Sequence, residues 1–598
     1  MASNKLFKDL NLKNKPSRNG FDLSSSIKFT AKCGELLPIW HRTVMPGDKF
    51  KISLESFTRT RPVQTAAFTK IKEYFDVFFV PYRLLGKQIP HILAQDKDNP
   101  VQATSPTSNH SIGTALPKMT LGALRGTLSY SVLSSGRLGT KTNEFGYYRS
   151  VLSSKLMNHL GYCWQSTNAV KKYSGIDNSI VLDPYDIYAS NNFVSLLPLA
   201  VYQKIYYDYY RNTQWEDNVP YNYNFDYLTS LGNFSLPSEN LDYWNNPTLF
   251  DLRYANYPKD LFFGLLPDSQ YGDTAVVDID FSGDFDQLSD VKDTDGNVIE
   301  VGPQVTGQVG RSITNSSNIA LSGSLSVSVK NQLDSLKGHF DILEFRKARM
   351  TQRYREILGT GKKTYASIID KIFGVSTPST LTDECMYLGG HTQYINISEV
   401  ENTNLVDNNL ATQRGKGLGS GNGSLIDFES KEYGCLMIIY HAVPEMDFAL
   451  NAYHFDALKI SVDDFANPLF DKLGFQDFPV YYLDNTNFYD VSKTPFIGYT
   501  SRYFDYKTGT DMVVGDFRET LYSWVAPLTP KLIFESIDPA SRPGVVLDYR
   551  FFKVNPSILN TIFDIDADSF IDTDQLRVST KFSVHAVRNI DYLGIPTN

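Results

Sequence analysis

The chain has 598 residues, with 57 Lys and Arg against 66 Asp and Glu and a hydrophobic content of 42%. These values exclude a disordered chain, a collagen-like repeat and a small disulfide-stabilised fold. The 37 Tyr and 38 Phe far outnumber the 9 Met, a balance that favours β-sheets over helical bundles.

The beginning of the chain is basic and the remainder is acidic. Residues 1–90 hold 16 Lys and Arg against 7 Asp and Glu, whereas the other 508 residues hold 41 against 59. We treat residues 1–32 as a basic N-terminal arm, which suits a polyanion such as nucleic acid, although a solvated terminus has the same composition. The candidate nucleic-acid-binding residues of this arm are Lys5, Lys8, Lys13, Lys15 and Arg18.

Two strands and a helix are predicted in the first 211 residues. Residues 50–55 alternate apolar and polar side chains, which indicates a strand with one face in water. Tyr74–Val80 is almost continuously apolar and predicts a strand buried on both faces. Pro198 opens a predicted helix that extends to Arg211 and is crowded with tyrosines. Tyr206 and Tyr210 of this helix could stack on bases, but core packing or a subunit contact is the more usual role of such a stripe.

The middle of the chain is rich in turn and loop signals. Asp293–Asn297 predicts a hairpin turn, and Ser312–Ser328 has the composition of a loop. A helix is expected from about Asp341 to Leu358, with Gly359 ending it. Its arginines, Arg346, Arg349 and Arg353, share one face, and we expect them to pair with carboxylates across a subunit boundary.

The last third contains a further glycine-rich tract and two strong strands. We interpret Gly415–Ser424 as a loop because Gly, Ser and Asn dominate it. Cys435–Tyr440 predicts a buried strand, and residues 576–586 show the clearest apolar and polar alternation in the chain. Since strands lie near both ends of the sequence, we expect one β-sandwich with long insertions.

Known catalytic and metal-binding motifs are absent from the sequence. There is no G-x-S-x-G or H-E-x-x-H, and the four cysteines form no C-x-x-C pair. Gly359–Thr364 lacks the first glycine and the Ser or Thr of a phosphate-binding loop, so we interpret it as a helix stop and a basic turn. We expect no enzymatic activity, no cofactor and no metal, and no secretory signal or membrane span is evident.

Motifs in constant order along nearly the whole chain resemble one known family. They include Phe21–Ser24, Cys33–Pro38, Met45–Phe50, Phe57–Val63, Thr65–Phe68, Leu197–Pro198, Gln352–Arg353, Tyr387–Gly390, Phe517–Arg518 and Asp574–Gln575. The chain resembles the major capsid protein of microviruses, small single-stranded DNA bacteriophages, and especially the gokushovirus-like branches. Residues 97–190 and 272–330 match this pattern poorly, and Thr382–Met386 departs from the Arg-Pro form of the family.

The resemblance implies an eight-stranded antiparallel jelly roll, mainly β, with a few helices in long insertions. It implies a single capsid domain over residues 33–598, with insertions at about 97–190 and 191–430 and a candidate surface protrusion at 272–330. It also implies pentamers and an icosahedral T=1 shell of sixty copies around circular single-stranded DNA, assembled in the bacterial cytoplasm as part of the virion.

The partners that follow are further copies of the chain and the packaged DNA, with no membrane. A small DNA-binding phage protein and a host surface receptor are additional candidates. The alternative from another class is a secreted-type β-sandwich carbohydrate-binding protein or glycosidase, since aromatic residues and carboxylates are abundant. The missing secretion signal counts against it.

Overall fold

The computed structural model describes about three fifths of the chain. The described residues are 17–63, 67–94, 115–128, 149–162, 192–228, 243–244, 246–276, 280–282, 337–339, 342–378, 381–401, 413–447, 454–479, 482, 496–509, 511–526, 549–563, 565 and 574–593. The predicted turn Asp293–Asn297, the tract Ser312–Ser328 and most of the candidate protrusion 272–330 lie outside them.

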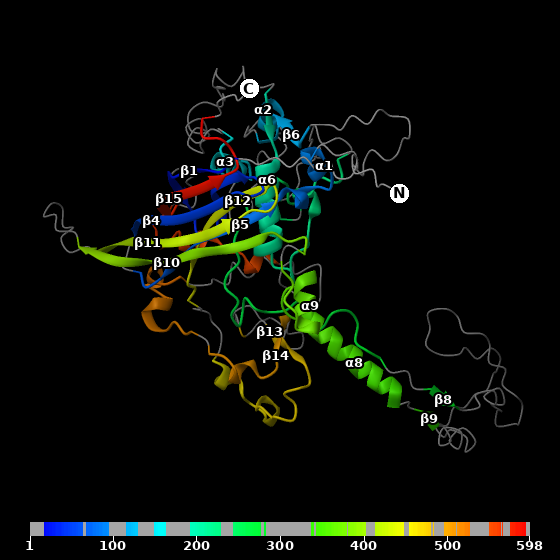
Figure 1. The fold of residues 1–598 in the computed structure, drawn as a ribbon. Coiled ribbons are helices and arrows are strands. Elements are labelled where there is room, and N and C mark those ends of the chain that lie inside the picture. Colours follow the sequence, from blue (N-terminus) through cyan, green and yellow to red (C-terminus); the bar gives the residue numbers. More distant parts are fainter. Residues whose placement is uncertain are drawn as a thin grey trace, which may run out of the picture. The chain divides into compact units, whose positions relative to one another are not determined.

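The longest strands of the described residues form one curled antiparallel sheet (Figure 1). Its strands follow the order β1-β15-β4-β11-β10-β5-β12-β3, and β2 also pairs with β15. Their bounds are β1 Asn19–Asp22, β2 Ser25–Ala31, β3 Leu37–Val44, β4 Lys49–Val63, β5 Ile71–Pro81, β10 Met386–Glu401, β11 Gln413–Glu429, β12 Gly434–Pro444 and β15 Leu576–Arg588.

The number of strand positions agrees with a jelly roll. β1 pairs with the C-terminal half of β15 and β2 with its N-terminal half, so the two strands share one position beside β15. Eight positions remain along the sheet. The predicted fold class, mainly β with an antiparallel eight-stranded arrangement, is confirmed.

The sheet has two halves that are joined by β10. We call β1, β2, β15, β4 and β11 the first half and β5, β12 and β3 the second half. Residues 386–395 of β10 pair with β5 of the second half, and residues 396–401 pair with β11 of the first half, so the sheet folds over itself at this strand. Trp40 on β3 packs against Phe582 on β15, with ring centroids 6.5 Å apart, although the two strands are far apart in the order. The two halves therefore face each other across a shared core.

The strand predictions from periodicity are confirmed. Exposed and buried residues alternate along β4 and β15, whereas every residue of β12 is buried and β5 is buried throughout from Phe75. The alternating strands lie in the first half, so one of their faces meets water, and the continuously buried strands lie in the second half.

The interpretation of Gly415–Ser424 as a loop is wrong. These residues form the middle of β11 and pair with β4 along its length. The alternate glycines face the core, where a Cβ on Gly417 would meet Thr60 and a Cβ on Gly421 would meet Gln393 and His391. Glycine is required here because side chains of the neighbouring strands occupy the space above the backbone.

The helices lie in the insertions between strands. Their bounds are α1 Gln88–Ala94, α2 Leu121–Leu128, α3 Arg149–His159, α6 Leu197–Ile205, α8 Ile342–Gly359 and α9 Tyr365–Phe373. The predicted helices at 198–211 and 341–358 are both found. The first changes into a π-helical turn at Tyr206–Tyr210, and α6 packs on β5 and β12, the second half of the sheet.

The remaining strands form three small two-stranded antiparallel sheets. They are β6 Lys118–Thr120 with β7 Phe193–Ser195, β8 Asp280–Ser282 with β9 Lys337–His339, and β13 Phe475–Pro479 with β14 Phe496–Ser501. The chain divides into two compact units. One comprises Met1–Ser269 with Gly361–Asn598 and contains the curled sheet, and the other is Gln270–Thr360, which contains α8.

Candidate functional site

A buried carboxylate lies at the centre of the space between the two halves of the sheet. Glu73 on β5 accepts hydrogen bonds from Tyr440 Oη at 2.6 Å, Thr58 Oγ1 at 2.8 Å and Gln393 Nε2 at 2.5 Å. Burial raises the pKa of Glu73, and the three hydrogen bonds act against that shift. The donors come from three other strands, so this carboxylate ties the two halves together and is not presented to solvent.

A second carboxylate lies on the opposite face of β5, beneath the π-helical turn. Asp76 accepts from Tyr210 Oη at 2.7 Å and from Tyr387 Oη at 3.3 Å. Burial raises the pKa of Asp76. His441 stacks on Tyr74 with ring centroids 4.7 Å apart, and burial lowers the pKa of His441 to about 3. The outer face of the second half is therefore covered by aromatic and polar groups of the same chain.

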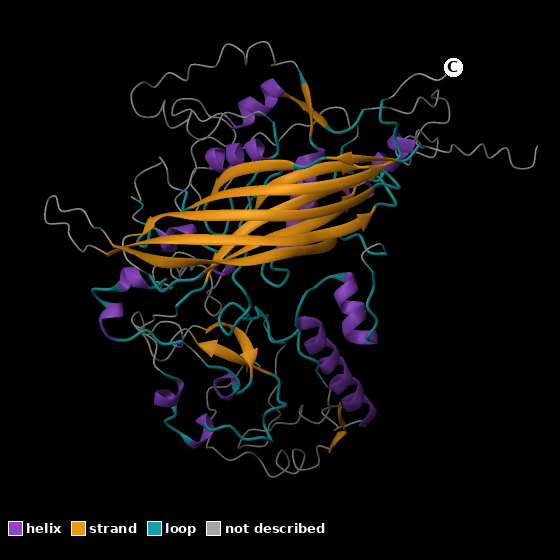
Figure 2. Ribbon diagram, turned by 60° about the vertical axis from the view of Figure 1, so that its left-hand side comes forward, coloured by secondary structure: helices purple, strands orange, loops and turns teal. Residues whose placement is uncertain are grey.

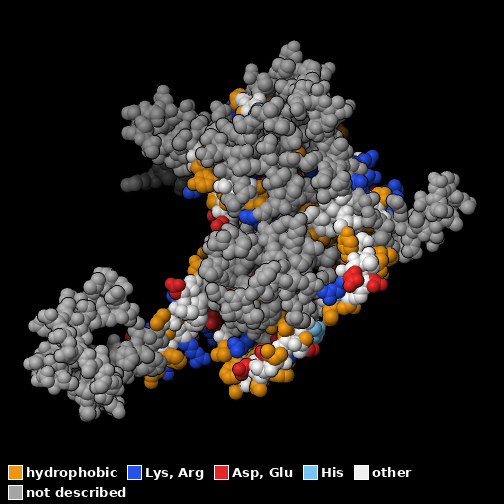
Figure 3. All heavy atoms as spheres, turned by 180° about the vertical axis from the view of Figure 1, so that it is seen from behind, with side chains coloured by type: hydrophobic (Ala, Val, Ile, Leu, Met, Phe, Trp, Pro, Cys, Tyr) orange, Lys and Arg blue, Asp and Glu red, His pale blue; other side chains and the backbone are white. Residues whose placement is uncertain are grey.

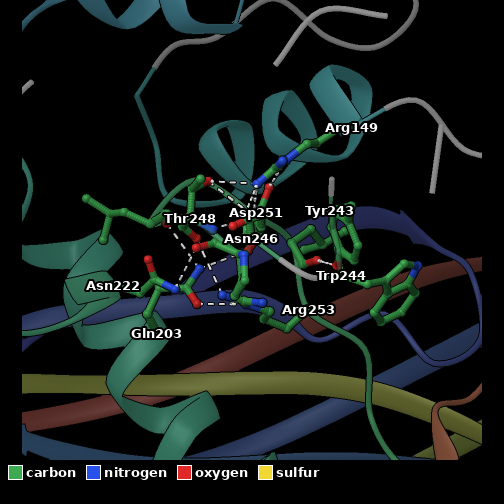
Figure 4. Close-up of polar contacts among 12 residues, drawn as sticks. Arg149, Gln203, Asn222, Tyr243, Trp244, Asn246, Thr248, Asp251 and Arg253 are labelled. Carbon is green, nitrogen blue, oxygen red and sulfur yellow. Dashed lines mark hydrogen bonds and ion pairs between the residues drawn. The ribbon is translucent and has the colours of Figure 1, made fainter. Parts of the chain in front are cut away.

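Buried charges hold the covering layer together. Arg149 at the start of α3 donates to both oxygens of Asp251, at 2.8 and 2.6 Å, and neither side chain is exposed (Figure 4). Arg253 donates to Gln203 Oε1 at 2.8 Å, and Gln203 Nε2 donates to the carbonyls of Leu249 and Asp251. Figure 4 shows these groups pointing toward one another from separate segments. They fix α3, α6 and residues 246–253 as one layer.

Two predicted interface tyrosines lie in the interior. Tyr206 is 2% exposed and donates to Glu216, and Lys553 Nζ donates to the Tyr206 hydroxyl at 2.7 Å. Tyr210 is 8% exposed and bound to Asp76. Burial raises the pKa of both tyrosines well above the usual value. Tyr209, which is 37% exposed, is the residue of this turn that a neighbouring copy could contact.

The predicted interface arginines lie on the surface of α8. Arg346, Arg349 and Arg353 are exposed, and none of them forms an ion pair with another described residue. The apolar side chains of the same helix are exposed as well, namely Ile342, Leu343, Phe345, Met350 and Tyr354. Figure 3 shows hydrophobic and basic side chains next to each other at the surface in this region. Within its own unit, α8 thus presents apolar and cationic groups together.

Of the predicted arm residues, only Arg18 can be placed. Lys5, Lys8, Lys13 and Lys15 lie outside the described residues. Arg18 is exposed and donates through Nη2 to the carbonyl of Gly47 at 2.7 Å. The arm therefore enters the sheet beside the turn between β3 and β4.

The outer face of the first half of the sheet carries basic residues that the sequence reasoning did not select. Lys28 on β2, Arg59 on β4, and Arg577 and Lys581 on β15 are all exposed. Figure 2 shows this broad face of the strands, and none of the described helices lies in front of it in that view. The signal was present in the polar positions of the alternating strands, which we interpreted only as a face in water.

The described residues contain no group of three or more His, Cys, Asp or Glu that could hold a metal ion. Within the same part of the chain, none of the helices is long and apolar enough to cross a membrane. The cysteines that the structure describes, Cys33, Cys385 and Cys435, are buried and free.

A family model described as "Capsid protein (F protein)" matches residues 11–125 and 170–597, which is nearly the whole chain. No curated protein matches the sequence. The two matched ranges include every strand of the curled sheet and the residues of its open face.

Proposed function

Because the chain belongs to the capsid (F) protein family of microviruses and forms the shell of a single-stranded DNA phage, we propose that sixty copies, arranged as pentamers, close into an icosahedral T=1 shell around a circular genome. The protein is a structural component of the virion and not an enzyme. The family therefore decides against the carbohydrate-binding or glycosidase alternative. The gokushovirus-like branch remains a proposal from the motifs quoted above.

The observation that carries this proposal is the family match together with a sandwich whose two outer faces differ. One face is covered by the chain's own helical layer, and the other is an open sheet. A closed shell needs subunits with distinct sides, since contacts between copies repeat through symmetry and modest interfaces become a cooperative assembly.

We assign three further roles within the shell, one to the α8 arginines and two to other segments. The exposed arginines of α8, Arg346, Arg349 and Arg353, contact a neighbouring copy, which their exposure beside apolar side chains supports. The arm residues Lys5, Lys8, Lys13, Lys15 and Arg18 meet packaged DNA, and residues 272–330 form a surface protrusion. These two roles rest on composition and on the family resemblance.

The test is assembly of the full chain. We expect pentamers or closed particles in size-exclusion chromatography with light scattering and in negative-stain microscopy, if necessary after the phage's other structural proteins are added. A protein that stays monomeric with those proteins present would contradict the proposal.

A further inference from the structure

We propose that α8 of one copy binds residues 454–469 of a neighbouring copy in the shell. We call residues 454–469 the acidic segment. This inference rests on the proposed shell and adds to it the surface that the α8 arginines meet on the neighbour. Each copy carries both surfaces, so the contact joins unlike sides of two identical chains.

The surface of α8 combines a cationic stripe with apolar side chains. Arg346, Arg349 and Arg353 are spaced three and four residues apart, so they lie along one side of the helix. All three are exposed. Met350 and Tyr354 are 61% and 49% exposed, and each directly follows an arginine of the stripe. The helix therefore presents arginines next to apolar groups.

Acidic groups on α8 offset the stripe only in part. The helix holds five Lys and Arg against two Glu. Glu344 lies two residues before Arg346, and residues two apart point to different sides of a helix. Glu356 lies three residues after Arg353, but one carboxylate offsets at most one arginine, and its Oε1 also accepts a hydrogen bond from Gln352 at 3.1 Å. The stripe thus keeps a net positive charge.

The acidic segment exposes large apolar side chains. Every residue from Ile460 to Leu469 is exposed. Ile460, Val462 and Leu469 are 90%, 88% and 84% exposed, and Phe465 is exposed as well. A cluster of large apolar side chains at the surface marks an interaction site. The segment is therefore suited to burial against another chain.

Negative charge lies among these apolar groups. The acidic segment holds three Asp against one Lys. That lysine, Lys459, pairs with Asp505 outside the segment at 2.7 Å, and both side chains are largely buried. Asp456 and Asp463 are exposed. His454 Nδ1 lies 3.5 Å from Asp456 Oδ2 but accepts a hydrogen bond from the Asp456 N–H, so it does not neutralise that carboxylate. Since nucleic acid has the same sign of charge, DNA is not the partner of this segment.

The acidic segment has a defined shape before it meets a partner. Asp464 Oδ2 accepts hydrogen bonds from the backbone N–H groups of Ile460 and Ser461, at 2.9 and 2.7 Å. Phe455 is buried, and its ring packs against Phe504 with centroids 5.3 Å apart. A surface that is already ordered loses less conformational entropy on binding, so it favours a stable contact.

Charge and apolar area are complementary between the two surfaces. Arginine binds a carboxylate with two parallel hydrogen bonds, and arginines beside aromatic and apolar side chains are typical of contacts between subunits. Because the two surfaces differ, the contact is heterologous, and it closes into a ring when the rotation between copies completes a circle. The occupant of the acidic segment is therefore a second copy of this chain.

The experiment exchanges the charges of the two surfaces in the full-length protein. The α8 reversal carries Arg346→Glu, Arg349→Glu and Arg353→Glu, and the segment reversal carries Asp456→Arg and Asp463→Arg. Asp464 is kept because it orders the segment. Light scattering measures the lowest protein concentration at which particles form, and the unfolding midpoint shows that each variant is folded.

Each reversal alone should raise that concentration about a hundredfold, because repulsion replaces attraction at a contact that every copy makes twice. The combined variant should assemble within about threefold of the wild-type concentration, since opposite charges face each other again. The matched control combines the α8 reversal with Asp217→Arg and Asp591→Arg, two exposed carboxylates outside both surfaces. It has the same net charge as the combined variant and should remain impaired.

A combined variant that assembles where the control does not supports the inference. The inference is overturned if either reversal assembles like the wild type, or if the combined variant assembles no better than the control. A wild-type protein that never assembles contradicts the proposed shell instead, so the two failures are distinguishable.

A crosslinking experiment identifies the contact as one between copies. Chains with Arg349→Cys and differently tagged chains with Asp463→Cys are mixed before assembly and treated with a bis-maleimide. We expect a product that contains both tags, and tagged chains without the added cysteines should not give it, since the described native cysteines are buried. Absence of the two-tag product from particles that do form would also contradict the inference.

Discussion

Arg149 donates two hydrogen bonds to the carboxylate of Asp251, and both side chains are completely buried. Arg149→Met leaves the Asp251 charge buried without its partner, and we expect a loss of about 3–5 kcal/mol in the free energy of unfolding. Urea denaturation of the unassembled subunit measures this loss.

The comparison variant for this pair is Lys507→Met, which breaks the half-exposed ion pair with Asp471. That change should cost at most about 1 kcal/mol. Adding Asp251→Leu to Arg149→Met should recover part of the loss, because the carboxylate that has lost Arg149 is then removed as well. Equal effects of Arg149→Met and Lys507→Met would show that the buried pair does not hold the covering layer.

The glycines of β11 give a second prediction. A Cβ on Gly421 would meet the side chains of Gln393 and His391, so Gly421→Ala must displace groups next to the Glu73 network. We expect a destabilisation of about 1–3 kcal/mol, as for an overpacked core. Thermal unfolding monitored by circular dichroism provides the measurement.

Gly20→Ala is the control for Gly421→Ala. Gly20 is also a strand glycine, in β1, but nothing lies within 4 Å of the added Cβ. This change should leave stability nearly unchanged or raise it slightly. If the Gly421→Ala protein has the same melting temperature as the wild type, the packing around β11 does not require glycine at this position.

The buried His441 predicts a pH dependence of stability. Its pKa is about 3 in the folded chain and 6.5 as an ordinary histidine, with burial as the cause. Between these values the unfolded chain binds the proton and the folded chain does not, so stability falls as the pH drops from 6.5 toward 3. The contribution is up to about 1.4 kcal/mol per pH unit.

His441→Phe should remove this contribution, so the variant's stability should decline less steeply with acid. Asp76 Oδ2 lies 3.7 Å from His441 Nδ1, and the pKa of Asp76 is raised by burial, which gives the opposite pH dependence. The comparison is therefore repeated in an Asp76→Asn background. Identical pH slopes with and without His441 in both backgrounds would contradict the prediction.

The α8 arginines predict an effect on assembly without an effect on folding. Arg346→Gln, Arg349→Gln and Arg353→Gln together remove three exposed cations. If each contact between copies loses about 1.4 kcal/mol, the protein concentration needed for assembly rises about tenfold. Light scattering across a concentration series measures this threshold, and the unfolding midpoint should not change.

A triple glutamine variant at Lys431, Lys472 and Lys507 removes the same charge elsewhere on the surface. It should assemble at the wild-type concentration. If the α8 variant also assembles at the wild-type protein concentration, these arginines do not contribute to the contact between copies.

Much of the fold was predictable because it is encoded locally. The alternation in β4 and β15 and the continuous apolar run of β12 depend on which faces of each strand are buried, and that is visible residue by residue. The helices α6 and α8 were predicted for the same reason. The strand β11 was missed because its glycines reflect side chains of β4 and β10 that lie above it, and these are distant in the sequence.

The sequence by itself determined the family, the β-rich class and the basic character of the first residues, since these follow from residue order and local periodicity. The tertiary structure alone decided that Tyr206 and Tyr210 are interior while Tyr209 is exposed. It alone placed Arg59 opposite Arg577 from strands more than five hundred residues apart. Pairing between distant strands depends on register and on the curl of the whole sheet, and neither property is carried by any short segment of the chain.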